Sequence, residues 1–432
     1  MRALTSAVAV LIFLALFLGL ALIRVPVAFS LGLAGMIVLA IFGQKLNTVP
    51  AVAYQSMDSF PYLAIPLFIF SGDLMTNGGI SRAIVDFAQA VLRKVKASYG
   101  MITVVASMLF GTVTGSALAT VAAIGSMMIP EMVKVGYKRG YATALVSASG
   151  FLGILIPPSI PGIFYSMVSG IPVPVIWAAT ILPGFLIGGG YILVNRYVMG
   201  NKQIATDTQE GYWEGISKRG KRCLPAVLMP ILIFGSIYGG IATPTEAAAV
   251  SVAYGLIVAI FVYKGIKVSE IWSVTRESAI SSAVICMLIA FAAIAARMIT
   301  FMNVADELSA LIHTYIKTPF AFLVSVNIMY LILGMLIDVN TAILVTGPIM
   351  IPMAKLYGID PVHFGAIVLV NLCIGFITPP FATCLFVGCR VGNVSMQEVL
   401  KPILPFLAVG LIVLILTTYF PALSTYVPKM LY

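Results

Sequence analysis

The chain has 432 residues, of which 61% are hydrophobic and only 9% are charged. Soluble proteins carry about 25% charged residues, so this composition excludes a soluble enzyme, a disordered chain and a nucleic-acid-binding domain. The 25 Lys and Arg residues exceed the 15 Asp and Glu residues, for a net charge of +10, and membrane proteins concentrate such an excess in cytoplasmic loops. We therefore expect an all-α polytopic membrane protein.

The first apolar run covers residues 3–23 and follows Arg2. At about 20 residues it is longer than the core of a signal peptide, and no small-residue cleavage site follows it. We expect it to be retained as the first membrane span.

A membrane-crossing helix needs about 20 predominantly apolar residues. Ten candidate spans are predicted, near 3–23, 27–42, 60–76, 140–170 and 175–195 in the first half and near 224–241, 246–263, 279–300, 361–389 and 402–420 in the second.

Two further apolar segments, near 98–133 and 320–355, are interrupted by polar residues. Lys and Arg flank both ends of the first segment, so both ends are expected in the cytoplasm. Two full spans would need about 40 apolar residues plus a turn, which this segment does not have. We expect a re-entrant hairpin with its tip at Gly111–Ser116 buried in protein. The second segment breaks at Gly334–Thr341, has few basic residues at its ends, and is expected to open from the opposite face.

Basic residues also predict the orientation of the chain. If the N-terminus is outside and the spans alternate, nineteen Lys and Arg residues lie inside and six outside. The reversed topology exchanges these numbers, and basic residues favour the cytoplasmic side. Both termini are therefore expected outside the cytoplasm, and the polar stretch 196–223 is expected to be a cytoplasmic linker.

The two halves share a constant spacing, because Pro130 and Pro352 differ by 352 − 130 = 222 residues. The same offset relates Gly125 to Gly347, Met128 to Met350, Gly153 to Gly375, and Pro157-Pro158 to Pro379-Pro380. Five spans precede the second half, so the second copy is expected to be inverted. Inverted repeats with broken helices around a midplane site are typical of secondary transporters.

These features divide the chain into six expected parts. They are a first scaffold part (1–92) with an arm helix at 80–92, a first transport repeat (93–195), the linker (196–223), a second scaffold part (224–319) with an arm helix at 303–316, a second transport repeat (320–392) and the last span (393–432).

Each repeat carries a Pro-Pro pair inside an apolar segment, Pro157-Pro158 and Pro379-Pro380. Proline interrupts a helix and frees a carbonyl one turn back, and in a membrane that carbonyl needs protein, water or an ion. A structural kink explains one such pair. Two pairs at equivalent positions, each after a hairpin, favour a binding site built from helix ends.

Helix ends and polar side chains at the tips and breaks indicate the chemistry of that site. C-terminal carbonyls attract cations, and N-terminal amides attract anions. The polar residues are Thr112, Thr114, Ser116, Ser149 and Ser159 in the first repeat, and Asp338, Asn340, Thr341, Asn371, Thr378 and Thr383 in the second. Oxygen ligands of this kind suit sodium better than zinc or copper.

Asp338 is an acidic residue at the expected depth of the midplane. A carboxylate there is costly and is functional by default. The alternative is a cap on the half-helix that follows, and both roles are compatible because a carboxylate has several lone pairs. Glu246 follows Thr243-Pro244-Thr245 and is either a helix-start residue or part of the transport path.

The sequence has no His-Glu-x-x-His, nucleophile elbow or P-loop, which are the patterns of common hydrolases and ATPases. Transport must then draw on an ion gradient or on a partner. An intramembrane enzyme or a lipid-modifying protein would need an ionisable pair at one depth. A channel is the third alternative, but hairpins from both faces favour alternating access.

The sequence also resembles a known family. Five segments carry the resemblance to the large membrane subunit of tripartite ATP-independent periplasmic (TRAP) transporters: Gly111–Ser116, Ala122–Met132, Gly153–Ser159, Pro66–Gly72 and Thr243–Ala247. The resemblance covers essentially the whole chain.

This resemblance implies a transporter of the ion-transporter superfamily in the bacterial inner membrane, with both termini periplasmic. Two hairpins and two broken helices would slide as an elevator against a scaffold. Sodium would drive import of an organic acid anion, commonly sialic acid or a C4-dicarboxylate, and no organic cofactor is implied.

The resemblance also implies partners besides membrane lipid. A small four-helix membrane subunit would bind alongside, and we expect it as a separate chain because this chain starts at the first scaffold span. A soluble periplasmic substrate-binding protein would deliver the anion. The alternative is a stand-alone sodium-coupled carboxylate permease or exchanger of the same fold.

Site residues follow from the matching motifs and from the polar residues at the tips and breaks. The expected sodium ligands are Ser116, Ser149, Gly153, Asp338, Asn340, Thr341, Gly375 and Thr378. The expected contacts of the anion are Thr114, Pro157, Pro158, Ser159, Pro380 and Thr383.

Overall fold

The described part of the chain is helical and contains no strand. In this computed structural model it comprises residues 2–92, 94–200, 212–304, 314–379 and 382–432. Eight of the described helices are long and apolar enough to cross a membrane, or ten when each of two bent pairs counts as one span. The prediction of an all-α polytopic membrane protein is therefore confirmed.

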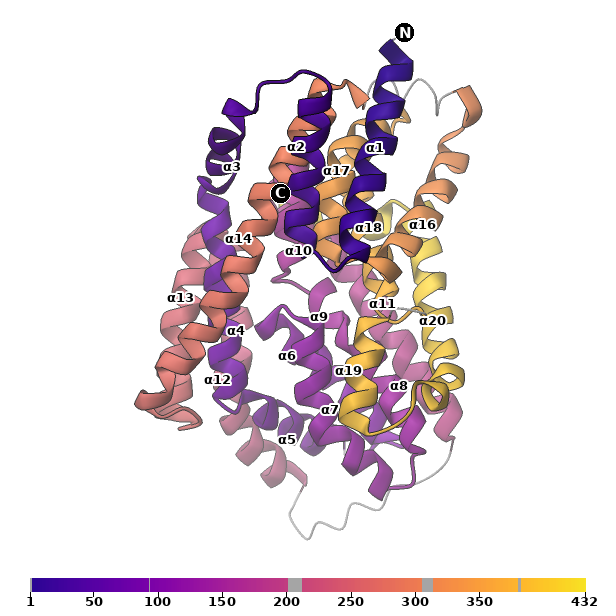
Figure 1. Ribbon diagram of the computed structural model, residues 1–432. Coiled ribbons are helices and arrows are strands. Elements are labelled where there is room, and N and C mark those ends of the chain that lie inside the picture. The colour runs from indigo at the N-terminus through magenta and orange to yellow at the C-terminus, as the bar shows by residue number, and fades with distance from the viewer. Residues whose placement is uncertain (1, 93, 201–211, 305–313, 380–381) are drawn as a thin grey trace.

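Four of the first five helices, α2 to α5, begin a layer along one side of the molecule. α1 (Arg2–Leu22) and α2 (Val27–Ile41) pack on each other, and α3 (Val49–Met57) continues into α4 (Ala64–Asn77) through a bend. α5 (Ile80–Leu92) is the expected arm helix, and it lies across the lower end of the molecule in Figure 1.

Three helices of the second half complete this layer. α12 (Tyr212–Tyr238) packs on α5, α13 (Pro244–Ile257) packs on α4, and α14 (Ile271–Phe301) packs on α2, α3 and α4. Gly35 lets α2 and α14 approach closely, because a Cβ built there would lie 3.3 Å from the Ala295 Cα atom. We call α2–α5 and α12–α14 the wall group; α3, α4 and α12–α14 lie on the left of Figure 1.

Both segments predicted as hairpins are pairs of helices that turn at the polar break. α6 (Ser98–Thr114) and α7 (Ala117–Lys134) form the first hairpin, and α16 (Pro319–Leu336) and α17 (Val339–Leu356) form the second. Adding 222 to the bounds of α7 gives 339 and 356, which are the bounds of α17. α6 and α7 lie in the lower half of Figure 1, and α16 and α17 lie in the upper half.

Both Pro-Pro segments break a helix. In the first repeat α8 (Arg139–Gly150) and the short α9 (Leu152–Leu155) are bent by 43° from α10 (Ile160–Ser169). In the second repeat α18 (Pro361–Gly375) is separated from α19 (Thr383–Gly392). α8 lies below α10, whereas α18 lies above α19 (Figure 1), so the two broken helices run in opposite directions.

The linker expected over 196–223 is shorter in the structure. α11 (Val173–Met199) extends into its first residues, and α12 already begins at Tyr212. The reason is that Lys and Arg are good helix formers, so their charge marks the membrane boundary but not the end of a helix.

The C-terminal part holds one helix more than expected. α20 (Met396–Tyr419) is the predicted last span, and α21 (Ala422–Leu431) follows it and packs on α11. The second expected arm helix, over 303–316, falls largely on residues 305–313, which lie outside the described residues.

Glu246 has the helix-start role. Its backbone N–H donates to Thr243 Oγ1 at 3.3 Å, and its side-chain Oε2 accepts from the Thr243 N–H at 2.8 Å. This reciprocal pair is a capping box at the start of α13.

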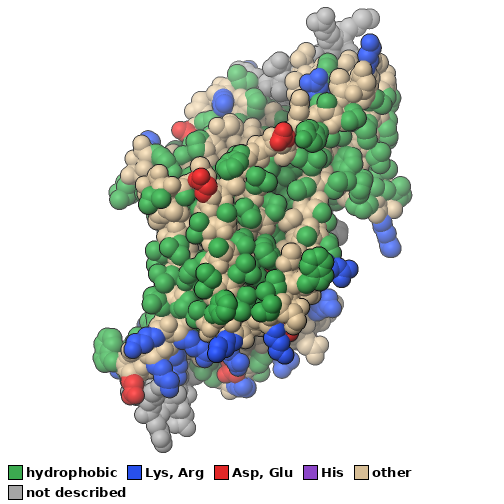
Figure 2. Space-filling model, turned by 90° about the vertical axis from the view of Figure 1, so that its left-hand side faces the viewer, with side chains coloured by type: hydrophobic (Ala, Val, Ile, Leu, Met, Phe, Trp, Pro, Cys, Tyr) green, Lys and Arg blue, Asp and Glu red, His purple; other side chains and the backbone are tan. Residues whose placement is uncertain are grey.

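The surface agrees with the predicted charge pattern. On the wall-group side, hydrophobic side chains cover the middle of the molecule and Lys and Arg gather along the lower edge (Figure 2). That edge is where α5 and the beginning of α12 lie (Figure 1).

Candidate functional site

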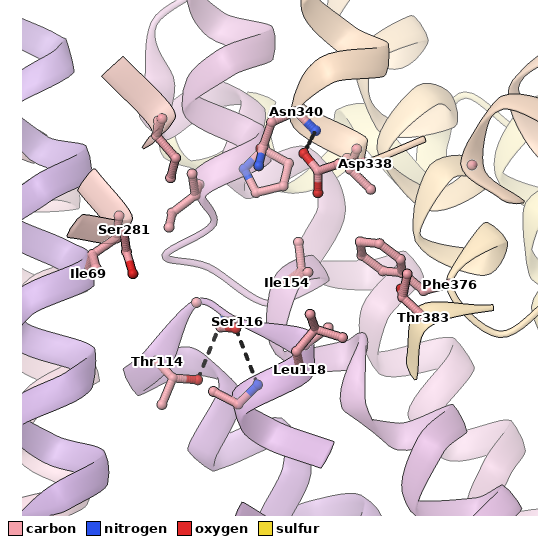
Figure 3. Close-up of a pocket in the computed structure, with 18 of the residues that line it drawn as sticks. Ile69, Thr114, Ser116, Leu118, Ile154, Ser281, Asp338, Asn340, Phe376 and Thr383 are labelled. Atoms are coloured by element: carbon pink, nitrogen blue, oxygen red, sulfur yellow. Dashed lines mark hydrogen bonds between the residues drawn. The ribbon is translucent and has the colours of Figure 1, made fainter. Parts of the chain in front are cut away.

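A cavity of about 520 Å³ lies between the two hairpin tips and the wall group. Its lining comes from the first tip (Thr114–Ala119), the second tip (Gly334–Asn340), the breaks (Ile154, Phe376), the starts of α10 and α19 (Ile160, Pro161, Thr383) and the wall helices α4 and α14 (Ile69, Asp73, Thr76, Ser281, Ile285). Figure 3 shows Thr114 and Ser116 on one side of this space, with Asp338 and Asn340 on the other.

The first tip turns through Gly115 in a left-handed conformation, with φ of +59°, which glycine adopts readily. Ser116 then caps α7, because its Oγ accepts a hydrogen bond from the Ala119 N–H at 3.3 Å. Thr114 Oγ1 accepts from the Ser116 N–H at 3.4 Å, and both contacts are drawn in Figure 3. Two hydroxyls of the tip therefore face the cavity beside exposed backbone.

Thr120 is a member of this tip that the sequence did not single out. Its Oγ1 donates to the Ser116 carbonyl at 2.7 Å and lies 3.5 Å from Thr114 Oγ1. The side chain is fully buried. A threonine in the first turn of a helix carries no distinctive sequence signal, because threonine hydroxyls commonly bond to a carbonyl one turn back.

The second tip is capped by Asp338. Its Oδ2 accepts from the Asn340 N–H at 2.9 Å, and its carboxylate is exposed to the cavity. The capping interpretation is confirmed, and it leaves lone pairs of the carboxylate available for a cation. The neighbouring Asn340 Oδ1 is buried and has no hydrogen-bond partner in the described part of the chain.

The two breaks bring backbones into contact. A Cβ built on Gly375 would lie 2.6 Å from the Gly334 Cα atom, and Gly153 meets Gly111 in the same way. Ser149 Oγ donates to the Leu145 carbonyl at 2.8 Å. In the second repeat, Thr378 Oγ1 donates to the Ile374 carbonyl at 2.8 Å. Hydroxyls that already donate keep their lone pairs and can still accept a cation.

Both short helices after the breaks begin at the cavity. Ile160 is the first residue of α10 and Thr383 is the first residue of α19, and both line the space. Ser159 caps α10 by accepting from the Gly162 N–H at 3.3 Å, and its carbonyl accepts from Trp177 Nε1 at 2.9 Å. The positive ends of two helices therefore meet in one cavity, which is an arrangement that binds anions.

Asp73 is a second acidic residue at the cavity. It lies near the C-terminal end of α4, four residues before Asn77. Its Oδ2 accepts a hydrogen bond from Ser278 Oγ of α14 at 2.5 Å, which joins two wall helices. An acidic residue within an apolar segment is a signal of a functional position. Its partner Ser278 could not be predicted, because it lies 205 residues away in the chain.

The predicted site residues are distributed as follows. Thr114, Ser116, Asp338, Asn340 and Thr383 line the cavity. Ser149, Gly153, Pro158, Ser159, Thr341, Gly375 and Thr378 do not line it and lie along the breaks and the first turn of α17. Pro157 lines a separate apolar groove, and Pro380 lies outside the described residues. The ligand roles stay predictions.

Comparisons with known proteins cover nearly the whole chain. The family model described as "Tripartite ATP-independent periplasmic transporter, DctM component" matches residues 14–423. The C4-dicarboxylate TRAP transporter large permease protein DctM of Pseudomonas aeruginosa is 36% identical over 93% of this chain and 94% of its own length.

Two further relatives are longer than this chain. The isethionate TRAP transporter permease protein DctMQ of Oleidesulfovibrio alaskensis is 34% identical over 96% of this chain, which spans 65% of that protein. The sialic acid TRAP transporter permease protein SiaT of Haemophilus influenzae is 34% identical over 95% of this chain, which spans 66% of it.

A solved structure shares the fold. The YdaH transporter of Alcanivorax borkumensis superposes with a TM-score of 0.65 over 97% of this chain and 98% of its own. The two sequences are 14% identical, so this likeness bears on the fold alone.

Proposed function

This chain belongs to the DctM component family of tripartite ATP-independent periplasmic transporters, and on that premise we propose that it imports an organic acid anion coupled to sodium. It is a large permease component and a multi-pass membrane transporter, not an enzyme. The substrate, the coupling ion, the partners and the motion are proposals, argued below.

One observation carries the proposal of coupling. Asp73 and Asp338 are the ionisable side chains among the described residues that line the cavity, so its fixed charge is negative. Like charges repel one another within one cavity, so an organic anion needs a compensating cation in the same space. Sodium bound at the tips would supply that charge, and each ligand would then favour binding of the other.

Oxygen ligands at the second tip support a sodium site. The Asp338 carboxylate faces the cavity, and the buried Asn340 Oδ1 accepts no hydrogen bond from the described residues. We propose that both coordinate one sodium ion with Thr341, Gly375 and Thr378. At the first tip, Ser116, Ser149 and Gly153 would hold another, because hydroxyls and freed carbonyls are ligands that hard cations prefer.

Helix ends support the proposal for the anion. The N-terminal amides of α10 and α19 begin at the cavity and require no Lys or Arg to bind a carboxylate. We propose that Thr114 and Thr383 contact the anion, and that Ser159 contributes at the start of α10, which it caps. The relatives are named for sialic acid, C4-dicarboxylates and isethionate, and we propose sialic acid or a C4-dicarboxylate for this chain.

The opposed hairpins support an elevator motion. We propose that the second repeat is an inverted copy of the first, and that hairpins and broken helices slide together against the wall group as scaffold. A separate small four-helix membrane subunit would bind the scaffold, and a periplasmic substrate-binding protein would deliver the anion. We propose that the lower edge, with its excess of basic residues, faces the cytoplasm of a bacterial inner membrane, because basic residues favour the cytoplasmic side.

Uptake into proteoliposomes tests the proposal. The liposomes would contain this chain and its small subunit, and labelled sialic acid, succinate and isethionate would be offered with sodium or potassium outside, with and without the matching binding protein. We expect uptake that requires both sodium and the binding protein. Sodium-driven uptake without that protein would instead indicate a stand-alone carboxylate permease or exchanger, and uptake equal in potassium would contradict sodium coupling.

A further inference from the structure

An apolar groove of about 670 Å³ separates the wall group from the first transport repeat. One side is formed by α12, and the other by α6 and α11. α12 packs on α5 and α13, which leaves its remaining face toward the groove. The lining is apolar almost throughout, so it needs an apolar occupant in the membrane.

A separate basic pocket lies about one turn beyond the groove along α11. Phe185, Gly189 and Ile192 line the groove, and Arg196 lines the next pocket together with Lys96. Residues three and four apart share one face of a helix. These residues follow one another at intervals of four, three and four, so one face of α11 carries first the residues of the apolar groove and then Arg196. The basic pocket has a volume of about 440 Å³.

From this alignment of the groove and Arg196 on one face of α11 we propose a binding site for one anionic phospholipid. An acyl chain would fill the groove, and the phosphate would bind Arg196. Basic pockets between helices on the cytoplasmic side bind anionic headgroups, and Arg binds phosphate through paired hydrogen bonds.

The dimensions fit a lipid of the inner leaflet. Ala226 and Tyr238 mark the two ends of the groove on α12, and at 1.5 Å per residue they lie about 18 Å apart. This is somewhat more than half of the roughly 30 Å hydrocarbon core, which is the reach of chains from one leaflet. Arg196 lies in the last turn of α11, at the expected inner surface.

Gly189 provides a substitution that closes the groove. A Cβ at Gly189 meets no atom within 4 Å, so Gly189→Leu places a side chain where the lipid would lie without displacing protein. Gly235 of α12 is also exposed and equally open, but it does not line the groove. Gly235→Leu is therefore the matched control. Lys401→Ala is the control for Arg196→Ala, because Lys401 is an exposed basic residue outside the pocket.

Native mass spectrometry of the purified full chain tests the proposal. The protein would be offered phosphatidylglycerol or phosphatidylethanolamine with identical acyl chains, after delipidation. We expect wild type and both controls to retain phosphatidylglycerol preferentially and Gly189→Leu to retain little of either lipid. Arg196→Ala should lower the preference for phosphatidylglycerol about tenfold, because it removes a charge-assisted hydrogen bond.

Three results would overturn the site. Equal retention of both lipids by wild type would mean that no headgroup is recognised. Unchanged retention by Gly189→Leu would mean that the lipid binds elsewhere. If Gly189→Leu keeps its lipid and instead loses the small membrane subunit during purification, the groove belongs to that subunit. Thermal unfolding of each variant shows that it is folded, and Arg196→Ala tests the headgroup even if Gly189→Leu does not fold.

Discussion

Gly153 lies so close to Gly111 that a Cβ built on either residue would overlap the other's Cα atom. The second repeat makes the same crossing between Gly375 and Gly334. Each broken helix therefore touches the first helix of its hairpin backbone to backbone, directly before the break. Only glycine fits at these four positions, and the contact holds the freed helix end against the tip.

Alanine at either break tests this crossing. Gly153→Ala or Gly375→Ala should destabilise the protein by about 1–3 kcal/mol, the usual cost of overpacking, and should abolish uptake because the break shifts. Thermal unfolding and uptake measure both effects. Gly235→Ala, where a Cβ meets nothing within 4 Å, should leave both unchanged. Normal uptake by Gly153→Ala would mean that the break tolerates displacement.

Asp338→Asn separates capping from ion binding. Asn caps helices about as well as Asp, so the α17 start should stay intact while the charge is lost. We expect a folded protein without sodium-dependent uptake. Asp360→Asn is the control, because Asp360 caps α18 in the same way, accepting from the Val362 N–H at 2.7 Å, but does not line the cavity. Wild-type sodium dependence in Asp338→Asn would assign Asp338 to capping alone.

Asn340→Ala removes the buried side-chain carbonyl oxygen that has no hydrogen-bond partner among the residues the structure describes. A bond to a charged group contributes about 1.5–3 kcal/mol, so the sodium concentration for half-maximal uptake should rise about tenfold or more. Uptake measured over a sodium series gives this value. The exposed Asn47→Ala should show no shift, and an unshifted curve for Asn340→Ala would remove this residue from the ion site.

Ser278→Ala tests the contact between two wall helices. It removes the donor to Asp73 Oδ2 at 2.5 Å, and the carboxylate loses a hydrogen bond of about 1.5–3 kcal/mol. We expect a lower unfolding temperature. Ser281→Ala changes the same helix one turn later and should leave the unfolding temperature as in wild type. If both variants unfold alike, the contact does not stabilise the wall group.

Single cysteines test the orientation. In a background with the half-buried Cys286 and Cys389 changed to serine, Lys45→Cys should react with a membrane-impermeant maleimide in intact cells. Lys138→Cys should react only after permeabilisation, because its basic surroundings are expected in the cytoplasm. The opposite pattern would invert the topology.

Polar breaks in apolar segments made most of the fold predictable. Gly115, Asp338 and the Pro-Pro pairs stand out because a membrane tolerates freed backbone and charge only where protein surrounds them. The hairpins, the breaks and five cavity residues followed from this signal.

The remaining features depend on tertiary packing. Pro157 lines the apolar groove and not the cavity, and Asp73 pairs with Ser278. Both depend on which helices become neighbours in the fold. Sequence distance hides such neighbours. The start of α12 at Tyr212 was missed because a search for apolar runs passes over a charged helical turn.

The bounds of α7 and α17 differ by the same 222 residues at both ends, so the two helices correspond residue for residue. If one repeat can take up the conformation of the other, exchanging their two conformations yields a second state with the same internal contacts and therefore a similar energy. A small energy gap is what a modest bias can reverse, and moving one charge through 100 mV supplies only about 2.3 kcal/mol. Sequence duplication would thus keep the free energies of the inward-open and outward-open states close to each other.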